Sequence, residues 1–278
     1  MIKTKGKHKK YAILLIIVII GIIAIWLSLP PEKKEKKPPS PKPEIKEIVK
    51  PEIKEKPLYR IAVIIDDVGY PSCMIEEYKN FKGKLTFSVL PFLDESVKYA
   101  EILHERGFEI LIHIPMEPLA YPDIDPGPQA IFSFDTREQV EKKITMMIQD
   151  LPYAVGANNH MGSKATQDCD LMDWTTDVLK KENLFFIDSV TANGSCAYRN
   201  ASAKKIPTAK RDVFLDNKDD YDSIYTRFEE LKRIARRKGT AIGIGHFNRN
   251  NTIKVLKEQS PLLEEERFTL IFASEAVM

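Results

Sequence analysis

Several residues able to bind metals or transfer protons stand where apolar segments end. Three of the five histidines in this 278-residue chain lie there, as does a pair of adjacent aspartates. Carboxylate oxygens and imidazole nitrogens are the ligands that zinc and related divalent ions take in proteins. This composition therefore predicts a metal site. Its candidate residues are Asp66, Asp67, His113, His160 and His246.

Each candidate also has an ordinary structural role open to it. Paired aspartates commonly shape a turn or cap a helix, and a histidine at a strand end is as often a structural group as a ligand. Asn158 and Asn159 could merely shape a tight turn. All these groups are expected at one end of the sheet, and this shared placement favours a functional site over separate structural roles. If strand geometry persists, Asp66 and Asp67 point in different directions, so one can bind a metal while the other acts as a base.

Glu117 stands four residues after His113. Pro115, between them, rules out a helical i, i+4 ligand pair. Glu117 is therefore a loop ligand, a partner of a ligand, or a surface group.

The elements that must position these residues alternate in type from Leu58 onward. Short apolar runs predict buried strands, and amphipathic segments between them predict helices, among them Arg137–Asp150 and Tyr221–Lys238. This alternation is typical of a parallel sheet, and the number of units favours a barrel. In such folds the active site lies at the carboxyl ends of the strands. The predicted strands are Ile61–Ile65, Leu85–Leu90, Glu109–Ile112, Ala154–Ala157, Leu184–Ile187, Asp212–Leu215, Ala241–Ile244 and Thr269–Phe272.

Charge is distributed unevenly along the chain. Residues 1–57 hold 14 lysines and 6 glutamates, a balance of +8, whereas residues 58–278 carry −6. An acidic body argues against nucleic acid as a partner, because binding phosphates needs a basic face. The body is long enough to bury its own core, and three cysteines are too few for a disulfide framework.

The first 57 residues divide by composition. Residues 1–10 form a short basic tail, and residues 11–29 form an uncharged apolar run just long enough to cross a bilayer as a helix. A cleaved signal peptide is the alternative, but the expected small residues are missing near Trp26 and Leu27. Residues 30–57, rich in Pro, Lys and Glu, predict an extended linker. Lysines flank both sides of the apolar run, so charge alone does not orient it.

Seven segments of the body, taken in order, resemble the divergent polysaccharide deacetylase family, which is related to the NodB-type carbohydrate esterases. The resemblance implies an α/β fold, a deformed (β/α)7-type barrel, and the apolar run at residues 11–29 predicts one N-terminal transmembrane helix before it. It covers nearly all of residues 58–278 and leaves out the first 57. The matching segments are Ile64–Gly69, Leu85–Pro91, His113–Pro118, Asn158–Ser163, Phe186–Ser189, Arg211–Asp216 and Gly243–Phe247.

The resemblance also implies roles for individual residues. Asp66 would be the general base and His246 the general acid. Asp67 and His113 would bind a divalent metal, most plausibly zinc. Glu117 stands where the family places a second histidine ligand, so His160 would complete the set, with Glu117 as the alternative ligand. Three further residues would orient the substrate or the catalytic groups: Asn159, Asp188 and Arg211.

The implied substrate is an N-acetylated glycan such as peptidoglycan. Such glycans lie outside the cytoplasmic membrane of bacteria, so we expect a single-pass protein of that membrane with its body on the outer side. Two alternatives stay open. One is a glycan-binding or envelope-organising protein that keeps the barrel without catalysis. The other is a different metal-dependent hydrolase, such as a glycosidase or a phosphodiesterase.

The three cysteines, Cys73, Cys169 and Cys196, all follow predicted strands. In an oxidising compartment Cys169 and Cys196 could pair, but a free thiol at each position is the other possibility. The oligomeric state is left open by the sequence.

Overall fold

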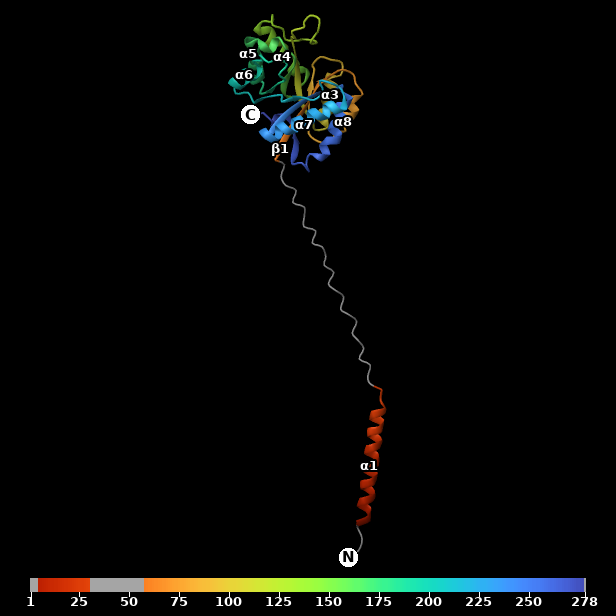
Figure 1. Cartoon of the computed structure of the whole chain (residues 1–278). Coiled ribbons are helices and arrows are strands. Elements are labelled where there is room, and N and C mark those ends of the chain that lie inside the picture. Colours follow the sequence, from red (N-terminus) through yellow and green to blue (C-terminus); the bar gives the residue numbers. More distant parts are fainter. Residues whose placement is uncertain (1–4, 31–57, 278) are drawn as a thin grey trace. The chain divides into compact units, whose positions relative to one another are not determined.

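The computed structural model describes residues 5–30 and 58–277, which belong to two compact units (Figure 1). The N-terminal unit contains a single described helix, α1 (Lys5–Ser28). Among the described residues, no helix combines the length and the apolarity needed to cross a membrane, so the span predicted over residues 11–29 is not supported. The predicted linker lies, apart from Pro30, outside the described residues.

In the described part of the body, nine strands form one sheet, and every pairing between them is parallel. The sheet order is β6-β5-β4-β3-β2-β1-β8-β7, and β9 pairs with the first half of β1. The strands are β1 (Tyr59–Val68), β2 (Thr86–Val89), β3 (Glu109–Met116), β4 (Ala154–Met161), β5 (Phe185–Asp188), β6 (Thr208–Lys210), β7 (Val213–Phe214), β8 (Thr240–His246) and β9 (Phe268–Ile271).

Helices connect most of the strands, as the alternation in the sequence predicts. Several begin at a residue whose side chain accepts a backbone hydrogen bond: Thr136 before α4, Asp168 before α5 and Asp220 before α7. Gly239 ends α7 in a conformation with φ of 83° that favours glycine. The helices of the body are α2 (Met74–Tyr78), α3 (Ser96–Glu105), α4 (Arg137–Asp150), α5 (Cys169–Lys181), α6 (Ala197–Ala203), α7 (Tyr221–Lys238) and α8 (Asn250–Gln259).

The two end strands of the sheet, β6 and β7, are consecutive in the chain and only two residues separate them. The amide of Arg211 donates to the carbonyl of Asp188 at the end of β5, and the amide of Asp212 donates to the carbonyl of Ile242 on β8. The sheet must therefore curl until its edges nearly meet, which confirms the predicted deformed barrel. The sequence did not predict β6, a three-residue strand with little apolar character.

Alternate side chains of the strands enter two separate cores. Ile61, Val63 and Ile65 of β1 pack in the larger core with residues of the helices. Ala62 and Ile64 pack in a smaller core formed by residues from several strands around the curled sheet. A residue's position along its strand therefore decides whether it faces the interior of the barrel.

Candidate active site

The same alternation brings the candidate residues to the barrel interior. Asp66 lies two residues beyond Ile64 on β1, and His113 lies two beyond Leu111 on β3. His246 likewise follows Ile244 on β8, and it is the register partner of Asp66. Since all of these strands are parallel, the side chains gather at one end of the barrel, as the sequence predicts.

Asp67 departs from regular strand geometry. The register between β1 and β2 shifts between Ile65 and Val68, so β1 carries an extra residue there, and Asp67 has φ of 62°. Its carboxylate Oδ1 lies 3.2 Å from His113 Nε2, and Asp66 Oδ2 lies 3.6 Å from the same nitrogen. The expectation that the two carboxylates point apart is therefore wrong, because the bulge turns Asp67 toward the site that Asp66 already faces.

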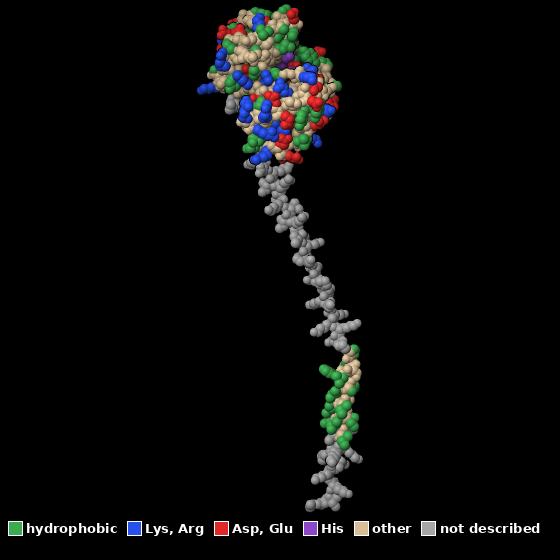
Figure 2. Space-filling view, in the orientation of Figure 1, with side chains coloured by type: hydrophobic (Ala, Val, Ile, Leu, Met, Phe, Trp, Pro, Cys, Tyr) green, Lys and Arg blue, Asp and Glu red, His purple; other side chains and the backbone are tan. Residues whose placement is uncertain are grey.

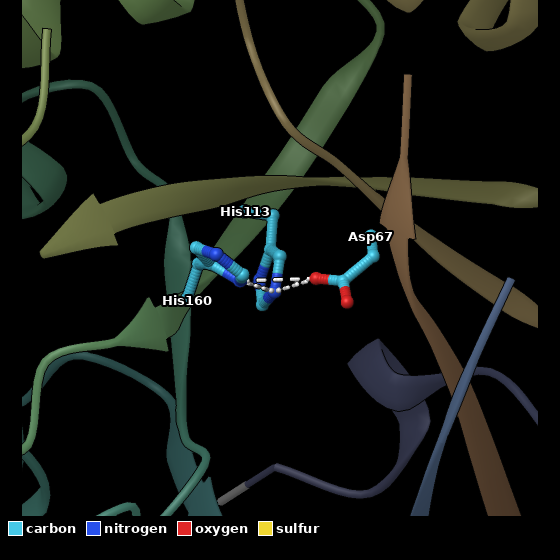
Figure 3. Close-up of side chains that lie close together, drawn as sticks. All are labelled: Asp67, His113 and His160. Carbon is cyan, nitrogen blue, oxygen red and sulfur yellow. Dashed lines mark hydrogen bonds and ion pairs between the residues drawn. The ribbon is translucent and has the colours of Figure 1, made fainter. Parts of the chain in front are cut away.

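Asp67, His113 and His160 converge on one point (Figure 3). Besides the 3.2 Å contact between Asp67 and His113, His160 Nδ1 lies 3.0 Å from Asp67 Oδ1 and 3.1 Å from His113 Nε2. Tetrahedral zinc bonds of about 2.0–2.1 Å would separate such ligand atoms by roughly 3.4 Å. The arrangement is compact enough for a single small cation.

Asn158 sets the chemistry of His113. Its side-chain oxygen accepts a hydrogen bond from His113 Nδ1 at 2.7 Å, so the neutral ring presents the lone pair of Nε2 to the cluster. The amide nitrogen of Asn158 donates to Asp66 Oδ1 at 2.9 Å. One fully buried amide thus orients both a proposed ligand and the proposed base. The sequence suggested only a turn at this position.

The donor atoms of the cluster fit a divalent cation. Two imidazole nitrogens and a carboxylate oxygen face each other at about 3 Å, so a ring proton or a metal cation must lie between them to offset their repulsion. Burial would raise the pKa of Asp67, but the close approach of His113 and His160 holds it well below its usual range, so the carboxylate stays ionised. Burial opposes protonation of His113, yet the charges of Asp66 and Asp67 outweigh it and raise the pKa of the ring. The site therefore attracts positive charge.

Asp66 is suited to accept a proton. Its side chain is almost fully buried, and this burial raises the pKa of the carboxyl above its ordinary value, although His113 and His246 pull in the opposite direction. A carboxylate with a raised pKa is a stronger base.

His246 is paired with Asp216, the last residue of the matching segment Arg211–Asp216. Asp216 Oδ1 lies 2.6 Å from His246 Nδ1, and Asp216 Oδ2 accepts hydrogen bonds from the His246 amide and from Thr252 Oγ1. Burial lowers the pKa of His246, but Asp216 more than compensates and raises it to about 9. The ring is therefore protonated at neutral pH. The strand pairing accounts for this contact. Phe214 pairs with Ile244, and Asp216 and His246 each lie two residues further along their chain segments.

Glu117 does not join the cluster. Its buried carboxylate accepts a hydrogen bond from the amide of Ser133 at 2.8 Å and one from Lys164 Nζ at 2.9 Å. Both partners lie in loops that follow strands, Ser133 after β3 and Lys164 after β4. Glu117 therefore ties two loops together.

The remaining predicted residues lie around the site without joining the cluster. Asn159 donates to the Met161 carbonyl and accepts from the Ser189 amide. Asp188 accepts from the Val190 amide and from Ser195 Oγ. The Arg211 guanidinium donates to the carbonyls of Ser189 and Val190 and lies over the ring of Phe214. These three side chains hold the loop after β5, and Phe214 in turn stacks on His246.

The loops after β4 and β5 are also joined covalently. Cys169 and Cys196 form a disulfide with a Cα–Cα distance of 5.3 Å. Figure 2 shows a histidine side chain in a hollow of the surface of the body. The side chains of His160 and His246 are 15% and 30% exposed, so an external molecule can reach the site.

Comparison with known proteins places this geometry in a family. Residues 63–277 match the family described as divergent polysaccharide deacetylase. The chain is 33% identical over 215 residues to the uncharacterized protein YibQ of Escherichia coli (strain K12), a match that covers 77% of this chain and 66% of that protein. An uncharacterized protein of Haemophilus influenzae is 31% identical over 198 residues, which are 71% of this chain and 70% of that protein.

A solved structure has the same fold. The crystal structure of the uncharacterized protein ATU2773 from Agrobacterium tumefaciens C58 superimposes with a TM-score of 0.74 at 22% identity. The alignment covers 79% of this chain and 89% of that one.

Proposed function

The chain belongs to the divergent polysaccharide deacetylase family, and on this basis we propose that it hydrolyses the N-acetyl groups of amino-sugar glycans. One observation supports the proposal above all others. Three metal-ligand side chains, Asp67, His113 and His160, converge beside a buried carboxylate and a protonated histidine. Amide hydrolysis needs these three functions together: an electrophile, a base and an acid.

The cluster would hold a divalent metal, which we propose to be zinc. Once bound, it would polarise the acetamide carbonyl and lower the pKa of water at the site. Asn158 keeps the Nε2 lone pair of His113 directed at this position.

The proton transfers are assigned to Asp66 and His246. Asp66 takes the proton of the attacking water, because burial makes its carboxylate more basic than usual. His246 gives a proton to the departing sugar amine, since Asp216 keeps the ring protonated until the pH approaches about 9. Without that proton the amine would be a poor leaving group.

The direct test is release of acetate from N-acetylglucosamine oligomers and from peptidoglycan by the full chain with added zinc. We expect the wild type to release acetate, and Asp66→Asn and His246→Ala each to lower kcat at least about 100-fold. His104→Ala is the matched control, because this histidine stacks on Tyr153 and lies outside the cluster. A wild type that binds these glycans but releases no acetate would instead identify a binding protein.

We also propose that the body works outside the cytoplasm. The disulfide between Cys169 and Cys196 supports this, because such bonds persist in oxidising compartments and are rare in the cytosol. An envelope glycan would be accessible there. Fusion of alkaline phosphatase to the C-terminus, which is active only after export, tests the location in a bacterial host.

A further inference from the structure

A long loop beside the metal cluster carries exposed aromatic side chains. Residues 117–136 connect β3 to α4 without a helix or strand of their own beyond a single bridge between Met116 and Ile131 (Figure 1, yellow-green). Loops of this length are uncommon inside a compact domain, and they are usually either functional or linker segments. Phe134 is 68% exposed and Tyr121 is 40% exposed, although large apolar groups are normally covered.

Three rings of this loop form a continuous row, the aromatic strip, which consists of Tyr121, Phe132 and Phe134. The ring centroids of Tyr121 and Phe132 are 4.8 Å apart, and those of Phe132 and Phe134 are 5.0 Å apart with nearly parallel planes. Phe132 is partly buried between the two exposed rings. The strip thus offers ring faces and one phenol hydroxyl to solvent.

The loop is held in place before any ligand binds. The Glu117 carboxylate binds Ser133, which lies between two rings of the strip, and Lys164. Asp135 accepts from the Phe132 amide and pairs with Lys143 at 2.6 Å. A preorganised aromatic surface loses little entropy when a ligand binds.

The aromatic strip lies close to the metal cluster. The Ile131 amide donates to the Pro115 carbonyl on one side of β3, and Pro115 is the register partner of His160 on the other side. Neighbouring strands are about 4.8 Å apart, so Ile131 lies about 10 Å from His160 across the sheet. Phe132 follows Ile131 directly. One extended molecule can therefore contact the strip and the cluster together.

From this placement we propose that the aromatic strip is a binding subsite for sugar rings that flank the reacting N-acetyl group, so that the protein selects a glycan polymer over a single sugar. Pyranose rings present apolar C–H faces that pack on aromatic rings, and their hydroxyl groups can pair with a phenol such as that of Tyr121. The inference rests on the proposed function, because it takes the glycan as the molecule that reaches the cluster.

The test compares binding of a pentamer of N-acetylglucosamine with binding of the monomer, by calorimetry on the full chain with zinc. Asp66→Asn is used as the background to prevent turnover. We expect Tyr121→Ala with Phe134→Ala to weaken pentamer binding about ten-fold and to leave monomer binding unchanged. Phe134→Trp should retain pentamer binding. Tyr225→Ala is the matched control, because Tyr225 is 38% exposed on α7 and stacks on Tyr221, outside the strip.

Pentamer binding that is as tight in the double variant as in the background protein would overturn the proposal. Equal affinity of the Asp66→Asn background protein for the pentamer and the monomer would also overturn it. So would a double variant that loses only its binding to phospholipid vesicles. The proposed hydrolysis is judged separately by acetate release. If pentamer binding depends on Phe134 but no acetate is released, the subsite proposal stands and the deacetylase proposal fails. If acetate is released and the strip variants have no effect on pentamer binding, the deacetylase proposal stands and the subsite proposal fails.

Discussion

Asn158 links the two sides of the proposed chemistry through one side chain. Its oxygen accepts from His113 Nδ1 while its nitrogen donates to Asp66 Oδ1, and both bonds are buried. Groups that orient metal ligands in this way usually contribute 10–100-fold to metal affinity. The neighbouring Asn159 makes its bonds to the loop after β5 instead. The pair therefore offers a comparison between adjacent residues of the same type.

We expect Asn158→Ala to weaken zinc binding by about 10–100-fold, and His160→Ala to weaken it further, because the first removes an orienting partner and the second a ligand. Competition with a chelating dye measures both. Asn159→Ala should bind zinc as the wild type does. Equal zinc affinity in all three variants and the wild type would show that the metal, if bound, is held elsewhere.

The pH dependence of activity should report the pair formed by His246 and Asp216. The pKa of His246 is raised to about 9, so the ring is protonated below that value and loses its proton as the pH rises through it. If His246 is the acid, kcat/KM falls on the alkaline side near pH 9. Asp216→Asn removes the negative charge that raises the pKa of His246, so the alkaline fall in kcat/KM should move to lower pH.

Asp212→Asn provides the matched control for this prediction. Asp212 pairs with Lys238 and accepts from the Ile242 amide, but no described contact joins it to His246. An alkaline limb that stays in place in Asp216→Asn would contradict the role assigned to His246.

The residues of the site were predictable to different degrees for a physical reason. Asp66, His113 and His246 stand where apolar runs end, and the sequence displays these runs directly. The direction of Asp67 depends on a bulge, and the partner of His246 depends on the pairing of the two-residue strand β7. Both depend on how the strands pair in three dimensions, so the sequence predicted neither the bulge nor the partner of His246.

At the scale of elements, the β3–α4 loop depends on a carboxylate that resembles a metal ligand in the sequence. Glu117 is 2% exposed and is bound by Ser133 and Lys164. Proximity in sequence to His113 suggested a shared function, but β3 continues to Met116, and Glu117 follows where the chain leaves the sheet. The side chain then meets loops instead of the barrel interior.

Glu117→Ala should therefore reduce stability and leave metal binding intact. Loss of the carboxylate leaves the Ser133 amide without its acceptor, which we expect to lower the free energy of unfolding by about 1–3 kcal/mol. Urea unfolding measures this, and the zinc content of the folded variant is the companion measurement. A fall in zinc content with unchanged stability would restore Glu117 as a ligand.

At this scale the ends of the long helices were more predictable than the ends of the strands. The predicted helices Arg137–Asp150 and Tyr221–Lys238 coincide with α4 and α7, because an amphipathic period and a capping residue are local signals. The predicted strand Asp212–Leu215 contains β7, whereas the sequence did not predict β6, because strands of two or three residues carry little local signal. Both β6 and β7 are strands because neighbouring strands supply their hydrogen bonds.

At the scale of the whole molecule, closure of the sheet is what concentrates the site. Arg211 and Asp212 connect β6 to β7 at the two edges of the sheet. Their amides donate to carbonyls at Asp188 of β5 and Ile242 of β8, so these two strands lie close together. An open sheet of the same strands would place β8 with His246 far from β4 with His160. The alternation of elements predicted a parallel sheet, and the number of units favoured closure, but the crossing point is visible only in three dimensions.

The disulfide links the segments that follow the neighbouring strands β4 and β5, and its contribution to stability can be measured. Cys169 and Cys196 are 27 residues apart, and a cross-link over such a loop stabilises a fold by about 3–4 kcal/mol through the unfolded chain. We expect Cys169→Ala combined with Cys196→Ala to lower the free energy of unfolding in urea by about this amount. A reductant should lower the free energy of unfolding of the wild type equally and should leave that of the double variant unchanged. Cys73→Ala is the control, because this cysteine is free and exposed. A wild type whose unfolding is unchanged by reductant would exclude the bond in solution and remove the main support for an extracytoplasmic body.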